Sequence, residues 1–357
     1  MVNRMNNAAQ PTQATSPQPK DWARPVRVWL YVIALLVLLM VTIGGITRLT
    51  DSGLSITSWK PISGTLPPLS QADWQAEFDA YKHIPEFKSQ NSWMELEEFK
   101  YIFWWEWGHR FLGRVIGLAF FVPFVVFLVQ RRIPKSLTPK LAALFVLGGF
   151  QGFLGWWMVS SGLSERVDVS QYRLATHLGA ACLLFAALIW VARRLTPHKL
   201  SNASRGGAAG FGAILALGVL VYVQLLLGAF VAGIDAGMAY NTWPLMDGDV
   251  IPNGLFVIQP VWKNFFENAL TVQFNHRLVA YLIAIYVAYL LWDTHKKRGF
   301  AGNHLWQPII GSMIALQIVL GIATLLAMVP IPLALGHQTL AFMIVGAITA
   351  YLADMRG

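Results

Sequence analysis

Apolar residues in this chain are gathered into blocks of about 20, the length at which an α-helix crosses the hydrocarbon core of a bilayer. Hydrophobic residues fill 55% of the 357 positions. A large soluble helical protein does not need so many blocks of this length, so we expect an all-α integral membrane protein with eight transmembrane helices. The expected spans are 27–47, 107–129, 140–161, 173–193, 207–229, 267–291, 306–327 and 333–353.

The positive charge orients these spans in the membrane. The net charge is +9, and most Lys and Arg residues fall in the N-terminal tail, in alternate loops such as 130–140 and 193–205, and at the C-terminus. Cytoplasmic loops carry such an excess, which predicts a multi-pass protein of the bacterial inner membrane with both termini cytoplasmic. The charge therefore does not indicate a nucleic-acid partner. Cys182 is the only cysteine, so no disulfide forms within the chain, and we interpret it as a packing residue.

The two halves of the chain resemble each other in short stretches that occur in the same order. This predicts two parallel repeats of four helices, related by an axis along the membrane normal. We expect a disordered cytoplasmic tail at 1–26, an N-terminal bundle at 27–193 that includes an external segment at 48–105, and a C-terminal bundle at 207–353. The matching stretches are Asp51–Pro61 with Asp235–Pro244, Gly108–Arg110 with Asn275–Arg277, Gln151–Gly155 with Gln317–Gly321, and His177–Ala180 with His337–Leu340.

Four histidines are predicted at one depth near the external ends of the spans. His109 and His177 lie in the first half, and His276 and His337 in the second. Ionisable side chains inside a membrane are costly and usually functional. Two pairs on facing helices predict two haem irons, each held by two imidazoles. A single such histidine is equally well explained by a hydrogen bond between helices, but two repeated pairs favour haem.

Small residues and arginines accompany the histidines. The small residues leave flat space for a porphyrin. The arginines are possible contacts for haem propionates, because a guanidinium can bind both oxygens of a carboxylate. Arginines that reach lipid headgroups are an equally good interpretation. The small residues are Gly108, Gly113, Gly179, Ala180 and Gly336, and the arginines are Arg110, Arg114 and Arg277.

One difference between the halves points to chemistry. Glu106 stands three residues before His109, on the same helical face, whereas Gln273 holds the aligned position in the second half. A buried carboxylate can accept protons or stabilise positive charge, and an amide can do neither. We therefore predict a catalytic first half and a redox or structural second half. The alternative for Glu106 is an ordinary acid at the membrane edge, within a belt of tryptophans.

These residues resemble the haem A synthase family, in its mitochondrial and alphaproteobacterial branch. The resemblance covers residues 29–351. It is strongest at Gly44–Ser55, Trp59–Pro68, Glu106–Arg110, Asn241–Met246 and Asn275–Arg277.

The resemblance implies an oxidoreductase that converts haem O to haem A by oxidising the C8 methyl to formyl, for assembly of cytochrome oxidase. Glu106 would be catalytic, His109 and His177 would hold haem O, and His276 and His337 would hold a haem b cofactor. Haem O synthase and oxidase assembly factors would be partners. Some branches carry an external cysteine pair, which this chain lacks.

Two other functions remain open on the residues alone. A bis-histidine dihaem cytochrome b that only carries electrons would leave the Glu106/Gln273 difference unexplained. A transporter built from parallel repeats would be colourless.

We also expect short helices in the external segment, one beginning near Ser70 and carrying Trp74, Phe78 and Tyr81, and one over 93–103.

Overall fold

The computed structural model describes residues 23–164, 166–195, 210–298 and 305–356, with side chains up to Lys296 in the third range. The expected tail at 1–26 therefore lies almost entirely outside the described residues. Within them, eight helices are long and apolar enough to cross a membrane. These are α1 (Ala23–Leu49), α4 (Leu96–Val129), α5 (Thr138–Val159), α6 (Gln171–Arg194), α8 (Phe211–Gly233), α10 (Ala269–Arg298), α11 (Trp306–Leu326) and α12 (Ile331–Met355).

The predicted all-α fold with eight spans is confirmed, and most boundaries agree within a few residues. The larger differences are at α4, which begins eleven residues before its expected start at 107, and at α10, which ends seven residues after its expected end at 291. The separate helix expected over 93–103 was wrong, because the chain from Leu96 onward forms the first turns of α4. No Gly or Pro interrupts the chain between Leu96 and Trp107, and Glu95 with Glu98 forms a capping box that starts the helix. At 34 residues, α4 is about 51 Å long, so it extends well beyond the hydrocarbon core.

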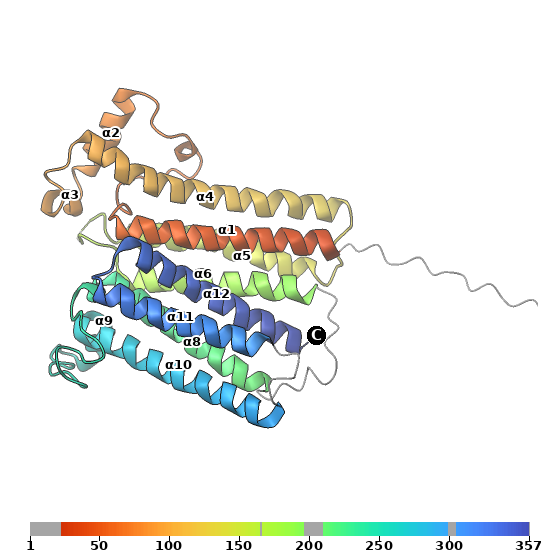
Figure 1. Ribbon diagram of the computed structural model, residues 1–357. Helices are drawn as coiled ribbons and strands as arrows, with labels where there is room; N and C mark the ends of the chain where they lie inside the picture. The colour runs from red at the N-terminus through yellow and green to blue at the C-terminus, as the bar shows by residue number, and fades with distance from the viewer. Residues whose placement is uncertain (1–22, 165, 196–209, 299–304, 357) are drawn as a thin grey trace, which may run out of the picture.

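The long helices form two adjacent groups (Figure 1). In the first group, α1 and α5 each pack against α4 and α6. In the second, α8 and α11 each pack against α10 and α12. The groups meet where α6 contacts α8 and α12 and where α1 contacts α12. Helices α1, α6, α8 and α12 are therefore central and more buried than the outer four. This adjacency agrees with the predicted repeat, which stays a hypothesis.

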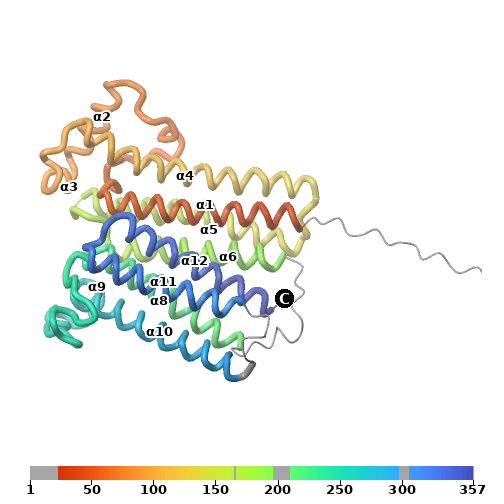
Figure 2. The backbone as a smooth tube through the Cα atoms, viewed as in Figure 1, coloured from red at the N-terminus to blue at the C-terminus, as the bar shows by residue number. Residues whose placement is uncertain are grey.

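One apolar core runs along the central helices. Its largest fully buried side chains include Leu30 and Ile33 of α1, Leu188 of α6, and Phe342 and Ile344 of α12. The tube trace shows α1, α6 and α12 next to one another (Figure 2).

Glycines bring the central helices close together where the two groups meet. A Cβ placed on Gly233 of α8 would lie 2.9 Å from the backbone of Gln171 in α6. A Cβ on Gly179 would lie 2.7 Å from Leu226 of α8. Gly179 is therefore a contact between helix groups, and our expectation that it leaves space for a porphyrin was wrong.

Segments at one end of the bundle form a second, smaller core on α4. They include α2 (Gln71–Tyr81) and α3 (Pro85–Ser89), while α9 (Asn264–Glu267) lies at the same end in the second half (Figure 1). Ser70 caps α2, as expected from its sequence, and Phe78 and Tyr81 are buried. The core also includes Leu54, Ile56, Ile84, Met94, Phe99, Ile102, Phe103 and Val169. It fixes the chain after α1 against α4.

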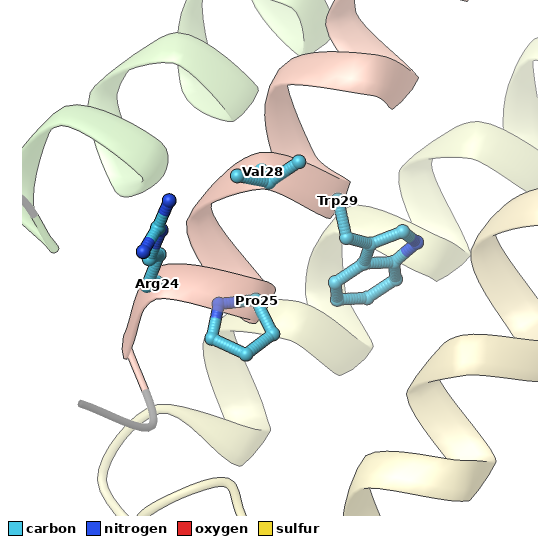
Figure 3. Close-up of a pocket in the computed structure, with 4 residues that line it drawn as sticks. All are labelled: Arg24, Pro25, Val28 and Trp29. Carbon is cyan, nitrogen blue, oxygen red and sulfur yellow. The ribbon is translucent and has the colours of Figure 1, made fainter. Parts of the chain in front are cut away.

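The opposite end holds the start of α1 and the end of α12 (Figure 1). There the carboxylate of Asp354 accepts two hydrogen bonds from Arg193 of α6, at 2.6 and 2.8 Å, and one from Trp306 of α11 at 3.0 Å. A shallow depression beside Arg24 and Trp29 also lies at this end, away from the histidines (Figure 3). The predicted chemistry therefore belongs to the loop-bearing end.

Candidate functional site

The two histidines of the first half each face a glycine on the neighbouring helix. His109 of α4 faces Gly44 of α1, where an added Cβ would lie 3.0 Å from the ring. His177 of α6 faces Gly155 of α5 at 3.4 Å. Both rings are half-buried. A Cβ at Gly44 would crowd the ring of His109, whereas a Cβ at Gly155 would make ordinary van der Waals contact with His177.

The second half repeats this arrangement and brings its histidines together. His276 of α10 faces Gly228 of α8 at 3.2 Å, and His337 of α12 faces Gly321 of α11 at 2.9 Å. The centroids of the two rings are 6.4 Å apart. Two imidazoles on opposite sides of one metal, each with a bond of about 2 Å, place their ring centres roughly 6 Å apart. The second pair is therefore spaced to share a single metal.

The set of donors fits a porphyrin better than a bare ion. Among the described residues, no group of three or more His, Cys, Asp or Glu side chains is placed to hold a metal. Two imidazoles alone do not complete the coordination of a transition metal, and a porphyrin supplies the remaining nitrogens. Cβ atoms on Gly108 and Gly336, beside His109 and His337, would meet nothing within 4 Å. No neighbouring side chain therefore closes the backbone beside these two histidines, and the predicted porphyrin space stays a prediction.

Glu106 is held at the junction of α4 and the segment after α1. It is only 2% exposed. Its Oε2 accepts hydrogen bonds from the Ser55 hydroxyl at 2.8 Å and the Ile56 backbone N–H at 2.6 Å, and its Oε1 accepts one from Arg110 at 2.5 Å. Three donors therefore surround this one carboxyl group. One helical turn separates it from His109.

Gln273 holds the aligned place in the second half, but it donates hydrogen bonds to its loop where Glu106 accepts them. Its Nε2 donates to the carbonyls of Ala236 at 2.6 Å and Ala239 at 2.9 Å, and its Oε1 accepts from Arg277 at 2.6 Å. The loop after α1 therefore presents donors to Glu106, whereas the loop after α8 presents acceptors to Gln273. The local backbone in each half matches its own residue.

The arginines expected to bind propionates are engaged with the loops. Arg110 donates to the carbonyls of Ile56 and Ser58, at 2.9 and 3.1 Å. Arg277 donates to the carbonyls of Tyr240 and Thr242, at 2.7 and 2.8 Å. Each arginine fastens a loop to its helix.

Two of these arginines keep a buried N–H donor that a ligand could engage. Arg114 donates to the carbonyls of Lys60 and Pro61, at 3.0 and 2.9 Å, but its Nη1 is buried without a hydrogen-bond partner. The Nε of Arg277 is also buried without a partner. These two atoms are donors that a carboxylate ligand could engage.

A second buried carboxyl lies outside the membrane spans. Glu86 of α3 is 3% exposed, and its Oε2 has no hydrogen-bond partner. Burial, reinforced by the negative charges of Asp51, Asp168 and Glu106, raises the pKa of Glu86 to about 8. This group therefore holds a proton at neutral pH.

Several residues of the site were missed by sequence reasoning. Ser55 is part of the family-like stretch after α1, but only the fold shows that it reaches Glu106. The match of Gln151–Gly155 with Gln317–Gly321 indicated a repeat, but not that these glycines face histidines. These glycines lie on other helices than the histidines they face, so no pattern within one helix could have found the contact.

Eight helices that are long and apolar enough to cross a membrane define a multi-pass membrane protein. Residues 27–349 match the model of a family described as cytochrome oxidase assembly protein. The chain is 54% identical over 318 residues to a "Heme A synthase" of Parvibaculum lavamentivorans, covering 89% of this chain and 90% of the relative. It is 50% identical over 349 residues to a "Heme A synthase" of Azorhizobium caulinodans, covering 97% of both. The chain belongs to the haem A synthase family.

Proposed function

We propose that this protein is a membrane oxidoreductase that converts haem O to haem A, oxidising the C8 methyl to a formyl group for assembly of cytochrome oxidase. The relatives named above support the reaction. The observation that carries the assignment to residues is the buried Glu106 beside His109, with Gln273 in its place in the second half.

We assign haem O, the substrate, to His109 and His177. We assign a resident haem b to His276 and His337, whose 6.4 Å separation suits one iron. Such a haem supplies one-electron transfer when bound. The first half then positions the methyl group to be oxidised, and the second half is the redox partner.

Glu106 acts as the fixed negative charge next to the reacting group. Its position is set by Ser55, Ile56 and Arg110 before any substrate binds, so no reorganisation is needed during the reaction. A buried carboxylate stabilises positive charge that develops as the methyl group is oxidised, and it can also accept a released proton. Gln273 can do neither, which limits the chemistry to the first half.

The free donors of Arg114 and Arg277 suit the propionates of the two haems, one arginine in each half. Arg110 assists indirectly, since it holds the loop and Glu106 together. We place the protein in the bacterial inner membrane with both termini cytoplasmic and the loop-bearing end external. We propose haem O synthase and oxidase assembly factors as partners, from the order of the steps that make and use haem A.

The test begins with a visible spectrum of the purified full-length chain and the masses of its extracted pigments. We expect two low-spin haems from cells that make haem O, and haem A among the pigments. His337→Ala should remove the cofactor haem, and Glu106→Ala should stop haem A formation while haem remains bound. Haem B alone in the wild type, even where haem O is made, would instead identify an electron-carrying cytochrome b. A colourless protein would exclude both functions.

A further inference from the structure

We propose that half-buried glutamines on the helices facing the histidines accept a hydrogen bond from the imidazole Nδ1–H, and that Met40 leaves His109 without one. Three of the four histidines would then be strengthened as iron ligands, and the substrate site would contain the weakest. This inference rests on the proposed role of the histidines as haem ligands.

The contacts in the second half show the arrangement most clearly. Gln317 stands one helical turn before Gly321, and its Nε2 donates to the backbone carbonyl of His337 at 2.9 Å. Gln224 stands one turn before Gly228, and its Nε2 donates to the carbonyl of His276 at 3.0 Å. Each glutamine is thus anchored to the residue whose ring it touches.

The remaining polar atoms are complementary. Oε1 of Gln317 and Nδ1 of His337 are both buried, and neither has a hydrogen-bond partner. The amide nitrogen of Gln317 lies 3.4 Å from Nε2 of His337, across the ring edge from Nδ1. A buried acceptor and a buried ring nitrogen are each costly while unpaired, and a hydrogen bond between them would remove both costs. Oε1 of Gln224 is likewise buried and unpartnered, with the amide 3.2 Å from both ring nitrogens of His276.

The same pair of orphaned atoms occurs at His177. Gln151 stands one turn before Gly155, which faces this ring. Oε1 of Gln151 and Nδ1 of His177 are both buried without partners. Three of the four glycine-facing histidines therefore have a glutamine at the same spacing.

The fourth position is different. Met40 stands one turn before Gly44, and its Cε would lie 3.3 Å from a Cβ on Gly113, one turn after His109. A thioether is only a weak acceptor. The ring of His109 is also turned differently, since its Nε2 is nearest to Gly44, whereas Cε1 is the nearest ring atom at the other three histidines. The three glutamine sites therefore share one ring orientation, and the methionine site does not.

A hydrogen bond accepted from Nδ1–H fixes the tautomer of a ligating histidine and makes it a stronger donor to the metal, typically changing metal affinity 10- to 100-fold. A stronger donor stabilises the ferric state and lowers the midpoint potential. The resident haem would have two such ligands, and the substrate haem only one. This difference retains the cofactor while allowing haem O to enter and haem A to leave.

Isosteric exchanges test the inference on the full-length protein purified with its haems. Gln317→Met removes the acceptor at His337, and Met40→Gln adds one at His109. Gln338→Met is the matched control, because the Gln338 amide donates to the carbonyl of Val41 at 2.7 Å and no contact with an imidazole is seen. The measurements are the midpoint potential of each haem and its rate of transfer to excess apomyoglobin.

We expect Gln317→Met to raise the potential of the second-site haem and to release it 10 to 100 times faster. Met40→Gln should lower the potential at the first site and slow release there, while Gln338→Met changes neither quantity. Unchanged potentials and release rates in Gln317→Met, or equal changes in Gln338→Met, would overturn the inference. If Gln317→Met does not accumulate, Met40→Gln decides alone. A wild type without two bis-imidazole haems would instead refute the proposed function.

Discussion

Glu106→Gln replaces one oxygen of a buried side chain by an amino group and so tests the site directly. If the amide oxygen stays with Arg110, the new amino group faces the Ser55 hydroxyl and the Ile56 N–H. The hydroxyl can turn and accept a hydrogen bond, but the Ile56 N–H cannot. One buried donor is therefore left unpaired, at a cost of about 1–3 kcal/mol.

The lost hydrogen bond destabilises the loop after α1, because Ser55 and Ile56 of this loop donate to Glu106 of α4. Opening of that loop should become roughly 5–150 times more frequent, and the Ile56 amide should exchange with solvent faster by the same factor. Haem A formation should be lost, since the amide carries no negative charge. Both haems should remain bound, because no histidine has been changed.

The assay compares haem content, haem A formation and amide exchange in the variant and the wild type. Glu97→Gln serves as a control, because Glu97 is 78% exposed and pairs only with Lys100, so it should change none of the three. Normal haem A formation by Glu106→Gln with slowed or unchanged exchange at Ile56 would show that neither the charge nor the hydrogen bond matters as argued.

Three further predictions follow from the packing and the charges. Gly321→Ala puts a Cβ 2.9 Å from the ring of His337 and should lower the content of the second haem, measured in purified protein; full occupancy would contradict this. The pKa of Glu86 is raised to about 8 in the folded protein, so the stability of the fold should fall as pH rises from about 4.5 to 8. Glu86→Gln should remove this fall, measured as the dependence of the unfolding midpoint on pH. The same pH profile in the variant and the wild type would refute the prediction. Asp354→Asn removes the charge paired with Arg193 and should destabilise the fold by about 3–5 kcal/mol, seen as a lower melting temperature; an unaltered temperature would show that the pair is dispensable.

Sequence patterns predicted most of the architecture, because the bilayer imposes a length and a composition on each span. The error at α4 shows the limit of this reasoning. Hydropathy marks where a helix enters the hydrocarbon, but Leu96–Trp105 continues the helix outside it with polar and aromatic residues. The error at Gly179 has a similar origin, since a small residue looks the same in sequence whether it faces a cofactor or a neighbouring helix.

The sequence by itself determined the number of spans and the contrast of Glu106 with Gln273, because each depends on residue type and spacing along one helix. Only the tertiary structure decided which groups meet across helices and loops. The donors on Ser55 and Ile56 that hold the carboxylate come from about fifty residues earlier in the chain. The glycine opposite each imidazole lies on a different helix, and no periodicity within one segment reports such a contact.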